Sequence, residues 1–453
     1  MMEVLLFCAL TAGVIAFSPV WRSVPPPDFR DAVAGGDEKN RSDGGLSFDH
    51  LLNTLSVEYA KGLEAPVPPP DDYMQMGDDD RLWVTLSASN SRERTRLLEA
   101  GMDIVEIGKD KVSGTIPQAL LPNFQTKSSR MLEMMPLSQH IALSRPKDFP
   151  DADAAFHNYQ ETTDLMKELA AKNPDVASLF SIGKTIEGRE IWCLRLNSSA
   201  KGNEPSSKPG SFYIGTHHAR EHLSTEVPLF FAVWLLDNRG TPEIKKYLDT
   251  LDIYVVPMLN ADGVEYDIKT GSYRWQRKNM RVNPDKSIGV DLNRNYDSWF
   301  GGAGVSHSPS ADTYCGPSAF SEPETLAVKL FIESRKNIRT SMSYHSYNKL
   351  VLYPWAGKTT PVENEKDRMI FEKLARGMAA FTGYTPKSCN ELYISTGGSD
   401  DWLYSAAGIF AFSTELEGNG FYPGAGVIKN AVVTNVKAAV YLLSVTADPQ
   451  AAQ

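Results

Sequence analysis

Residues 211–222 read SFYIGTHHAREH, a short apolar run followed at once by three histidines, an arginine and a glutamate. The aromatic and β-branched side chains of residues 211–215 predict a buried strand. The polar residues that follow would then lie at the carboxyl end of this strand, where ligands bind in an open α/β sheet. The stretch therefore predicts both a strand of such a sheet and a functional site at its end.

Three further predicted strands also run into polar residues. Because the carboxyl ends of parallel strands meet at one edge of a sheet, we expect these polar residues to converge on a single crevice. The strands and the residues that follow them are 252–259 with Asn260, 340–344 with His345, and 409–414 with Glu415.

Helices and strands alternate from about residue 156 onward. Residues 159–172 have apolar side chains at helical spacing and stop at Asn173-Pro174, while residues 191–196 predict another strand. Such alternation is typical of a sheet covered by helices. We expect a mixed, mostly parallel, doubly wound α/β sheet with helices on both faces over residues 146–453.

Composition excludes several classes of protein. The chain has 453 residues, of which 42% are hydrophobic, enough for a large core and two or more domains. Its formal net charge of −10 leaves no extended basic surface, so we expect no nucleic-acid partner. Only four cysteines are present, too few for a dense disulfide framework.

The first 80 residues predict a leader and a linker. Residues 4–17 are an apolar run too short to span a bilayer, although no basic residue precedes it, so we predict a signal peptide over 1–17. Residues 18–80 are rich in Pro, Gly and Asp, as expected of a solvated linker. No later run reaches 18 apolar residues, and we therefore expect a secreted protein without a membrane segment.

A small α+β unit is predicted over residues 81–145. Residues 82–87 predict a strand, Asn90 caps a helix that ends at Gly101, and residues 102–108 predict a second strand. The connection that follows shows no clear periodicity and contains basic residues at Arg130 and Arg145. We expect this connection to be exposed.

Two side chains in the opening stretch have metal-ligand spacing. His218 and Glu221 are three residues apart, close enough to reach one ion from a single turn, and His345 is the best candidate for a third ligand. His217 and His222 are competing ligands. Taken alone this spacing is common, and an ordinary loop with an ion-paired glutamate would explain it equally well.

Five motifs follow one another along the chain: THHAREH (216–222), GVDLNRN (289–295), YHSY (344–347), GGSDDW (397–402) and TEL (414–416). Together they resemble the zinc carboxypeptidases of the pancreatic A/B type. The match covers roughly 300 residues in the family's order and spacing, a far more specific signal than any single motif. The unit over 81–145, behind a signal peptide, also resembles the inhibitory propeptide of that family.

The resemblance implies one zinc ion bound by His218, Glu221 and His345. It also implies that Glu415 is the general base, with the neighbouring Glu417 as a less favoured candidate. Asp291 would hold a ligand histidine in the correct tautomer.

An arginine that stabilises the oxyanion is implied as well. Residues 274–279 read RWQRKN, one residue out of step with the family's W-R-K-x-R stretch. Arg277 keeps the Arg-Lys pair in register, and Arg274 is the alternative.

Substrate contacts follow from the same motifs. Arg294 and Asn293 match the clamp for the terminal carboxylate of a peptide, and a guanidinium suits that task. Asp400 matches the floor of the pocket for the departing side chain, where an acid implies preference for Lys or Arg. The remaining implied contacts are Arg220, Tyr347 and the mobile Tyr393.

These implications describe a secreted zymogen that removes basic residues from peptide or protein C-termini, and we expect it to be a monomer. Its propeptide would inhibit the cleft until an activating protease cuts between Arg130 and Arg145. Alternatives are A-type or broad specificity, an amidohydrolase of the same fold that trims acidic polymers, and an inactive peptide-binding relative. Three cysteines remain after the predicted signal peptide, and Cys315 with Cys389 is the one disulfide that we expect.

Overall fold

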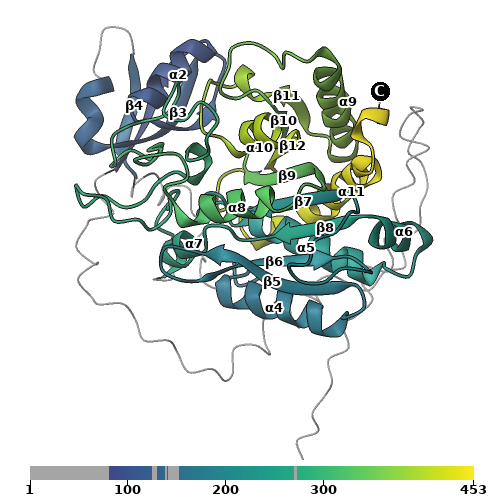
Figure 1. The fold of residues 1–453 in the computed structure, drawn as a ribbon. Coiled ribbons are helices and arrows are strands. Elements are labelled where there is room, and N and C mark those ends of the chain that lie inside the picture. Colours follow the sequence, from purple (N-terminus) through teal and green to yellow (C-terminus); the bar gives the residue numbers. More distant parts are fainter. Residues whose placement is uncertain (1–80, 125–129, 138–139, 141–152, 270–272, 453) are drawn as a thin grey trace, which may run out of the picture.

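An eight-stranded mixed sheet forms the larger part of the chain, in the order β11-β10-β12-β9-β7-β8-β6-β5 (Figure 1). This computed structural model describes residues 81–124, 130–137, 140, 153–269 and 273–452. The predicted signal peptide and linker, over 1–80, lie outside the described residues. The strands are β5 Ala177–Lys184, β6 Glu190–Leu196, β7 Gly210–Gly215, β8 Asp252–Val256, β9 Ile338–Ser346, β10 Leu350–Tyr353, β11 Thr385–Ser388 and β12 Phe410–Leu416.

The predicted fold class is confirmed. Strands β12, β9, β7 and β8 at the centre of the sheet are parallel, and antiparallel pairs lie toward its two edges. Strands β6, β7, β8, β9 and β12 fall where the sequence predicts them, and β8 ends before Pro257, which has no N–H to continue the ladder. Strands β5, β10 and β11 were not predicted, because β11 reads TPKS and β10 has only four residues.

Helices cover both faces of the sheet, as the alternating side chains of its strands require. Tyr213 of β7 packs into one layer with α4, α5, α6, α9 and α11, and its hydroxyl donates to the carbonyl of Ala439. Phe212 and Ile214 point to the other face, which α8 and α10 cover. The helices are α4 Tyr159–Lys172, α5 Leu223–Asp237, α6 Pro242–Thr250, α7 Ala261–Ile268, α8 Pro323–Glu333, α9 Glu365–Thr382, α10 Ser399–Ala407 and α11 Ile428–Thr446.

A separate four-stranded antiparallel sheet, in the order β2-β3-β1-β4, lies beside one end of this body (Figure 1). We call it the N-terminal unit. Its core joins apolar side chains of the strands to Leu97 and Leu98 of α2, whose first turn is capped by Asn90. The elements are β1 Arg81–Ser87, α2 Ser91–Glu99, β2 Asp103–Ile107, β3 Lys111–Pro117 and β4 Met131–Pro136.

Only some of the secondary-structure elements of the N-terminal unit were predicted from the sequence. Strands β1 and β2 with α2 between them were predicted, but β3 lies between β1 and β2 and was missed. Residues 131–136 were predicted to belong to an exposed connection without regular structure. The absence of regular structure is wrong, because they form β4, which pairs with β1. Their exposure is confirmed, since Leu132 and Met134 remain exposed at this sheet edge.

Aromatic packing and hydrogen bonds join the N-terminal unit to the body. Trp83 of β1 meets Trp275 edge to face at 6.1 Å between ring centroids. Arg81 donates to the carbonyl oxygens of Arg274 and Trp275 at 2.8 and 3.0 Å, and the Thr115 hydroxyl donates to buried Asp312 at 2.7 Å. These contacts join residues that are far apart in the sequence, so the position of the N-terminal unit depends on tertiary structure.

The predicted disulfide is not formed. Cys315 and Cys389 are free thiols, as is Cys193. Cys315 is buried with its sulfur 3.9 Å from Nδ1 of His307, whereas Cys389 lines the cavity described below. The two thiols therefore have different surroundings, and the expectation of a bridge is wrong. Among the described residues, no helix is both long and apolar enough to cross a bilayer.

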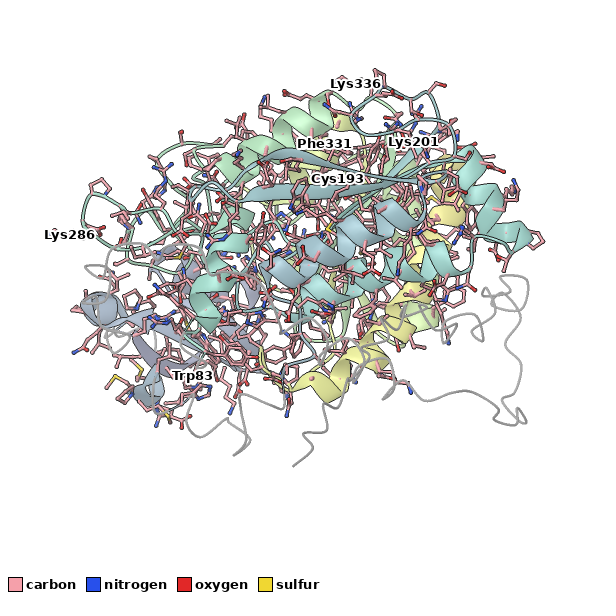
Figure 2. All side chains as sticks on the ribbon, turned by 90° about the horizontal axis from the view of Figure 1, so that it is seen from below. Trp83, Cys193, Lys201, Lys286, Phe331 and Lys336 are labelled. Atoms are coloured by element: carbon pink, nitrogen blue, oxygen red, sulfur yellow. The ribbon has the colours of Figure 1, made fainter. Side chains whose placement is uncertain are left out.

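Phe331 of α8 tests the layer between this helix and the sheet. Phe331, labelled in Figure 2, is 4% exposed. Its ring centroid lies 5.6 Å from that of Phe212 and 5.1 Å from that of Tyr254. Phe331→Ala should lower the free energy of unfolding by about 3–5 kcal/mol, because it removes buried apolar area and leaves a cavity. Urea denaturation followed by circular dichroism measures this change. The neighbouring Leu330, 56% exposed, is the matched control, and a similar loss for Leu330→Ala would contradict this account.

Candidate active site

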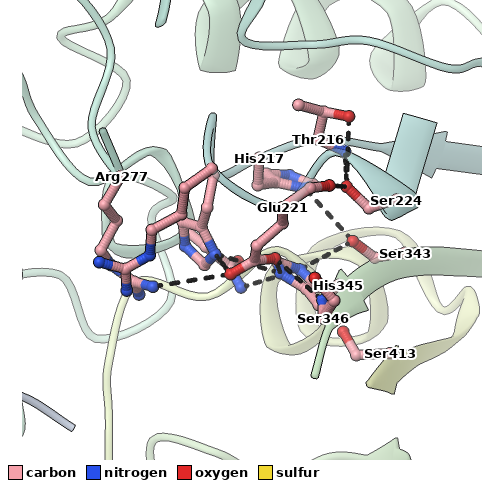
Figure 3. A network of polar contacts seen from close by, with 12 residues as sticks. Thr216, His217, Glu221, Ser224, Arg277, Ser343, His345, Ser346 and Ser413 are labelled. Carbon is pink, nitrogen blue, oxygen red and sulfur yellow. Dashed lines mark hydrogen bonds and ion pairs between the residues drawn. The ribbon is translucent and has the colours of Figure 1, made fainter. Parts of the chain in front are cut away.

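Three side chains that can bind a metal converge at the carboxyl ends of the central strands, two of which, Glu221 and His345, are labelled in Figure 3. Nδ1 of His218 lies 2.8 Å from a Glu221 carboxylate oxygen and 3.2 Å from Nδ1 of His345, which is itself 3.0 Å from the other Glu221 oxygen. Zinc ligands at about 2.0–2.1 Å in tetrahedral array lie roughly 3.3 Å apart. This buried His-Glu-His cluster, with its atoms all within 4.8 Å, therefore fits one such ion.

The local fold explains how the cluster forms. Strands β7 and β9 are parallel neighbours, and their register pairs Gly215 with Tyr344, the residue before His345. A side chain on Gly215 would meet the carbonyl oxygen of Ser224 at 2.0 Å, so only glycine lets α5 begin this close to β7. The chain between β7 and α5 is thus a tight turn that carries His218 and Glu221 to His345.

The far nitrogens of both histidines have partners. Nε2 of His218 lies 3.1 Å from a carboxylate oxygen of Asp291, to which it donates when the imidazole is neutral. Nε2 of His345 lies 3.2 Å from the hydroxyl of Ser343. A neutral imidazole that donates from Nε2 has its lone pair on Nδ1, so both histidines present an acceptor to the centre of the cluster.

The competing histidines point elsewhere. His217 is buried with Nδ1 3.2 Å from the Ser343 hydroxyl and Nε2 3.0 Å from that of Tyr296. Burial and its histidine neighbours hold the pKa of His217 well below the usual range, which keeps the ring neutral. His222 lies 2.9 Å from the Asp267 carboxylate. Neither belongs to the cluster.

Glu415 lies beside the cluster on β12. Strands β12 and β9 are parallel, and their register places Glu415 directly opposite His345. Burial, together with the charge of Glu221, raises the pKa of Glu415 to about 8. A bound cation would lower it again, because positive charge favours the carboxylate. Glu417 lies elsewhere, next to the Tyr384 hydroxyl and the Asn430 side chain.

The structure distinguishes the two candidate arginines. Arg277 is buried, donates to Asp291 from Nε and Nη2 at 3.1 and 2.9 Å, and lies 3.9 Å from Glu221. The guanidinium of Arg274 instead lies on the ring of Tyr266, 4.8 Å from its centroid. Only Arg277 lies at the cluster.

A cavity of about 320 Å³ opens onto these residues. Its wall includes Arg294 and Asn293, which the 289–295 motif supplies, and Tyr393 and Tyr347. A side chain on Gly397 would meet the Arg294 carbonyl oxygen at 2.1 Å, so this glycine allows the segment before Asp400 to lie against Arg294. The predicted substrate contacts that line the cavity are Arg220, Asn293, Arg294, Tyr347, Tyr393 and Asp400.

Asp400 contributes to the cavity wall a carboxylate with one oxygen that lacks a hydrogen-bond partner among the described residues. It is 7% exposed, and one carboxylate oxygen accepts a hydrogen bond from Ser413 at 2.6 Å. The other oxygen is buried and has no partner among the described residues. Burial raises the pKa of Asp400 to about 6. The adjacent Asp401 differs, because it accepts backbone N–H bonds from Ala356 and Gly357.

Arg220 has a partner that the sequence did not reveal. Its Nη2 donates to Asp103, the first residue of β2 in the N-terminal unit, and the same carboxylate lies 3.7 Å from Arg277. Asp103, Ser343 and Ser413 carry no motif and were missed. A lone acid or serine in a strand gives no signal until the fold brings it to the site.

Comparison with known proteins gives a family match that includes the residues of this site. The family model described as "Zinc carboxypeptidase" matches residues 162–438, most of the body. The chain belongs to the zinc carboxypeptidase family. Members are metallocarboxypeptidases, which hydrolyse peptides with one zinc ion, and the predicted family, enzyme class and cofactor are thereby confirmed.

Relatives of this zinc carboxypeptidase include A and B types. Human carboxypeptidase B is 33% identical over 59% of this chain and 64% of its own length. A "Zinc carboxypeptidase" of Saccharothrix mutabilis subsp. capreolus is 29% identical over 81% of this chain and 89% of its own.

Carboxypeptidase A from Helicoverpa armigera shares the fold, with a TM-score of 0.67 at 22% identity. The match covers 83% of this chain and 98% of the insect structure. Residues 146–453 alone could not supply that coverage, so the match extends to residues before 146.

Asp291 offers a test of the cluster that does not require turnover. Asp291→Asn should weaken zinc binding about 10- to 100-fold, because the His218 imidazole loses the carboxylate that fixes its orientation. Competition for zinc with a chromogenic chelator measures the dissociation constant. The exposed Asp285 is the matched control. Unchanged zinc affinity in Asp291→Asn would contradict the role inferred for this carboxylate.

Proposed function

We propose that the protein is a zinc carboxypeptidase that removes Lys or Arg from peptide C-termini and is made as a secreted zymogen. The observation that carries the basic preference is the buried, unpaired oxygen of Asp400 in the wall of the cavity. A buried carboxylate without a cation is unfavourable, and a substrate ammonium or guanidinium supplies the missing charge.

His218, Glu221 and His345 hold the metal in this proposal. When bound, zinc supplies a Lewis acid that polarises the scissile carbonyl and makes water acidic enough to react at neutral pH. Asp291 orients His218, and Ser343 orients His345. The chain thus presents a fixed ligand set.

Glu415 is the general base. It is half-buried, lies opposite His345 in the β12–β9 register, and lines the cavity. Its carboxylate takes a proton from the attacking water and then passes that proton to the leaving amine. The same group therefore serves both halves of the hydrolysis.

Arg277 stabilises the negative charge that develops on the attacked carbonyl oxygen. Its two hydrogen bonds to Asp291 fix the guanidinium plane, so no reorganisation is needed as charge develops. Because Asp291 also contacts His218, one carboxylate aligns the metal ligand and the cation together.

Arg294 and Asn293 bind the terminal carboxylate, and Tyr393 closes over it. Arg294 donates from Nη1 to a backbone carbonyl, whereas its buried Nε has no partner among the described residues. A carboxylate can satisfy this donor, since guanidinium groups bind carboxylates through parallel hydrogen bonds. Recognition of a free carboxylate restricts cleavage to the last residue.

Release of single residues tests the function. Blocked peptides that end in Arg, Phe or Glu are incubated with the full chain after limited digestion by trypsin, with and without a zinc chelator. We expect chelator-sensitive release with Arg faster than Phe. Faster release of Phe would contradict the basic preference alone, and no release from zinc-loaded, digested protein would contradict the enzyme.

One observation favours a second candidate specificity. Lys387 of β11 lines the same cavity as Asp400. If Asp400 were protonated, an acidic terminal side chain would find a cation at Lys387. Faster release of Glu than of Arg supports this second candidate.

Asp400→Ser tests whether this carboxylate sets the preference for a basic terminal residue. Arg release should fall about 100-fold in kcat/KM, because the substrate cation loses its buried partner, while Phe release should change by less than about threefold. Steady-state kinetics on the two peptides gives the ratio. The exposed Asp297 provides a matched control, Asp297→Asn. Equal losses for both peptides would show that Asp400 acts on the fold rather than on the terminal side chain.

Three contacts support a zymogen. Ile104, Val105 and Ile107 of β2 form part of the cavity wall, so the N-terminal unit closes one side of it. Asp103 occupies Arg220. Helix α2 also holds both sides of Tyr393: Arg94 donates to the carbonyls of Glu391 and Leu392, and the Thr95 hydroxyl accepts from the Ile394 N–H at 2.9 Å. The N-terminal unit thus restrains the tyrosine that would close over substrate.

Activation in this proposal requires an external protease that cuts between Arg130 and Arg145. The backbone of Arg130 pairs with Ser87 at the start of β4, so a cut there would have to open the sheet. Arg145 lies outside the described residues. Secretion rests on the predicted signal peptide over 1–17.

Asp103→Ala tests the inhibitory contact. The undigested chain should release terminal Arg about tenfold faster than undigested wild type, because loss of a buried ion-pair partner weakens docking of the N-terminal unit. The exposed Asp110 in the same unit is the control, Asp110→Ala. Initial rates measured with a protease inhibitor present decide the outcome, and equal rates in all three chains would contradict autoinhibition by Asp103.

A further inference from the structure

We propose that the Cys389 thiol is a covalent modification site beside Asp400, and that it takes a small alkyl thiol carrying an ammonium group, delivered by its disulfide. The thiol and the carboxylate line the same cavity. Cys389 is free and partly exposed, whereas Cys193 and Cys315 are completely buried. The effect on turnover rests on the proposed function, but the covalent step itself requires no hydrolysis.

Asp400 makes this cysteine selective for a cation. The acid is 7% exposed, and its Oδ2 accepts a hydrogen bond from Ser413. Its Oδ1 is buried and has no partner within the described part of the chain. A buried carboxylate without a cation is unfavourable, so an ammonium that enters the cavity is held there. A reagent that carries both an ammonium and a reactive sulfur is thereby held close to the thiol.

Strand register brings the two groups within reach of one small molecule. Strand β10 lies between β11 and β12, and it pairs Tyr353 with the residue before Cys389 and Leu352 with Ser413. The thiol and the hydrogen-bonded pair of Ser413 and Asp400 therefore lie on the two sides of β10, each about 4.8 Å from it along the sheet. A bound aminoethyl group reaches roughly 5 Å from the cysteine sulfur to its nitrogen. The two side chains cover the remaining distance.

The surrounding acids disfavour reagents without a positive charge. Burial and the charges of Asp400, Asp401 and Glu415 raise the pKa of the Cys389 thiol well above its usual range. Because the thiolate is the species that attacks a disulfide, neutral and anionic disulfides react slowly here. An ammonium in the cavity offsets the negative charge and favours the thiolate. Lys387 also lines the cavity, and the opposite charge preference would follow if this cation dominated.

The exchange balances with the disulfide as the oxidant. The Cys389 thiolate attacks one sulfur of an aminoalkyl disulfide, so that a new S–S bond forms as the original one breaks. The proton lost from Cys389 ends on the released aminoalkyl thiol. The bound ammonium then lies at Asp400, where the terminal Lys or Arg side chain would bind, and blocks release of these residues until a reductant reverses the exchange.

The test compares cystamine, bis(2-hydroxyethyl) disulfide and 3,3′-dithiodipropionate, which carry positive, neutral and negative groups. Each is incubated with the zinc-loaded full chain after limited trypsin digestion, and peptide mass spectrometry measures the rate of modification at Cys389. Each rate is divided by that of the same disulfide with N-acetylcysteinamide, a neutral thiol. We expect the normalised rate of cystamine to exceed that of the hydroxyethyl disulfide about tenfold, because the ammonium raises the thiolate fraction, and the carboxylate reagent to be slowest.

Two variants separate charge from access. Asp400→Ser should reduce the preference for cystamine at least threefold, and Asp297→Ser, the same change at an exposed position, should leave it as in wild type. Cys389→Ser should make Arg release insensitive to cystamine, measured after desalting and restoration of zinc. Equal normalised rates for cystamine and the hydroxyethyl disulfide, faster reaction of the carboxylate reagent, or a cystamine preference that persists in Asp400→Ser would overturn the inference.

Failure of the proposed function gives a different result. Absence of Arg release from unmodified wild type, with Cys389 labelled selectively by cystamine, would contradict the carboxypeptidase and leave the modification site established. Labelling of Cys193 or Cys315 in preference to Cys389 would overturn the modification site whatever the rate of Arg release.

Discussion

Three buried side chains bring hydrogen-bond acceptors within contact distance of one another, and the rest of the candidate active site is arranged around that constraint. The nitrogens of His218 and His345 and the oxygens of Glu221 lie within hydrogen-bond distance of one another, an arrangement that a shared cation makes favourable. Each histidine is turned by a partner on its far nitrogen. Asp291 is the most connected of these partners, because the carboxylate that orients His218 also fixes the plane of Arg277.

The cavity wall carries side chains of both charges. Acids are supplied by Glu221, Asp400 and Glu415, and guanidinium groups by Arg220, Arg277 and Arg294. In the intact chain Asp103 pairs with Arg220. The N-terminal unit therefore contributes both apolar area and one carboxylate at the position where positive charge would otherwise be unmatched.

Two kinds of interaction hold the N-terminal unit on the body: apolar burial and directional hydrogen bonds. Trp83 with Trp275 and the surrounding apolar side chains supply non-directional burial. Arg94, Thr95 and Asp103 supply directional contacts to the Tyr393 segment and to Arg220. Directional contacts of this kind couple the N-terminal unit to the Tyr393 segment and to Arg220. Apolar burial alone would only shield these residues from solvent.

The sequence by itself determined the central strands and the helix over 159–172 through their local hydrophobic pattern. Its motifs, by their resemblance to the family, indicated the candidate metal ligands and the candidate roles of Glu415, Asn293, Arg294 and Asp400. Tertiary structure alone decided that His217 and His222 turn away, that Arg277 and not Arg274 meets Asp291, and that Cys315 and Cys389 remain apart as free thiols. It also brought Asp103, about a hundred residues earlier in the chain, to Arg220. Such contacts depend on strand order and docking, which place side chains from distant segments together without leaving any mark in the sequence near either one.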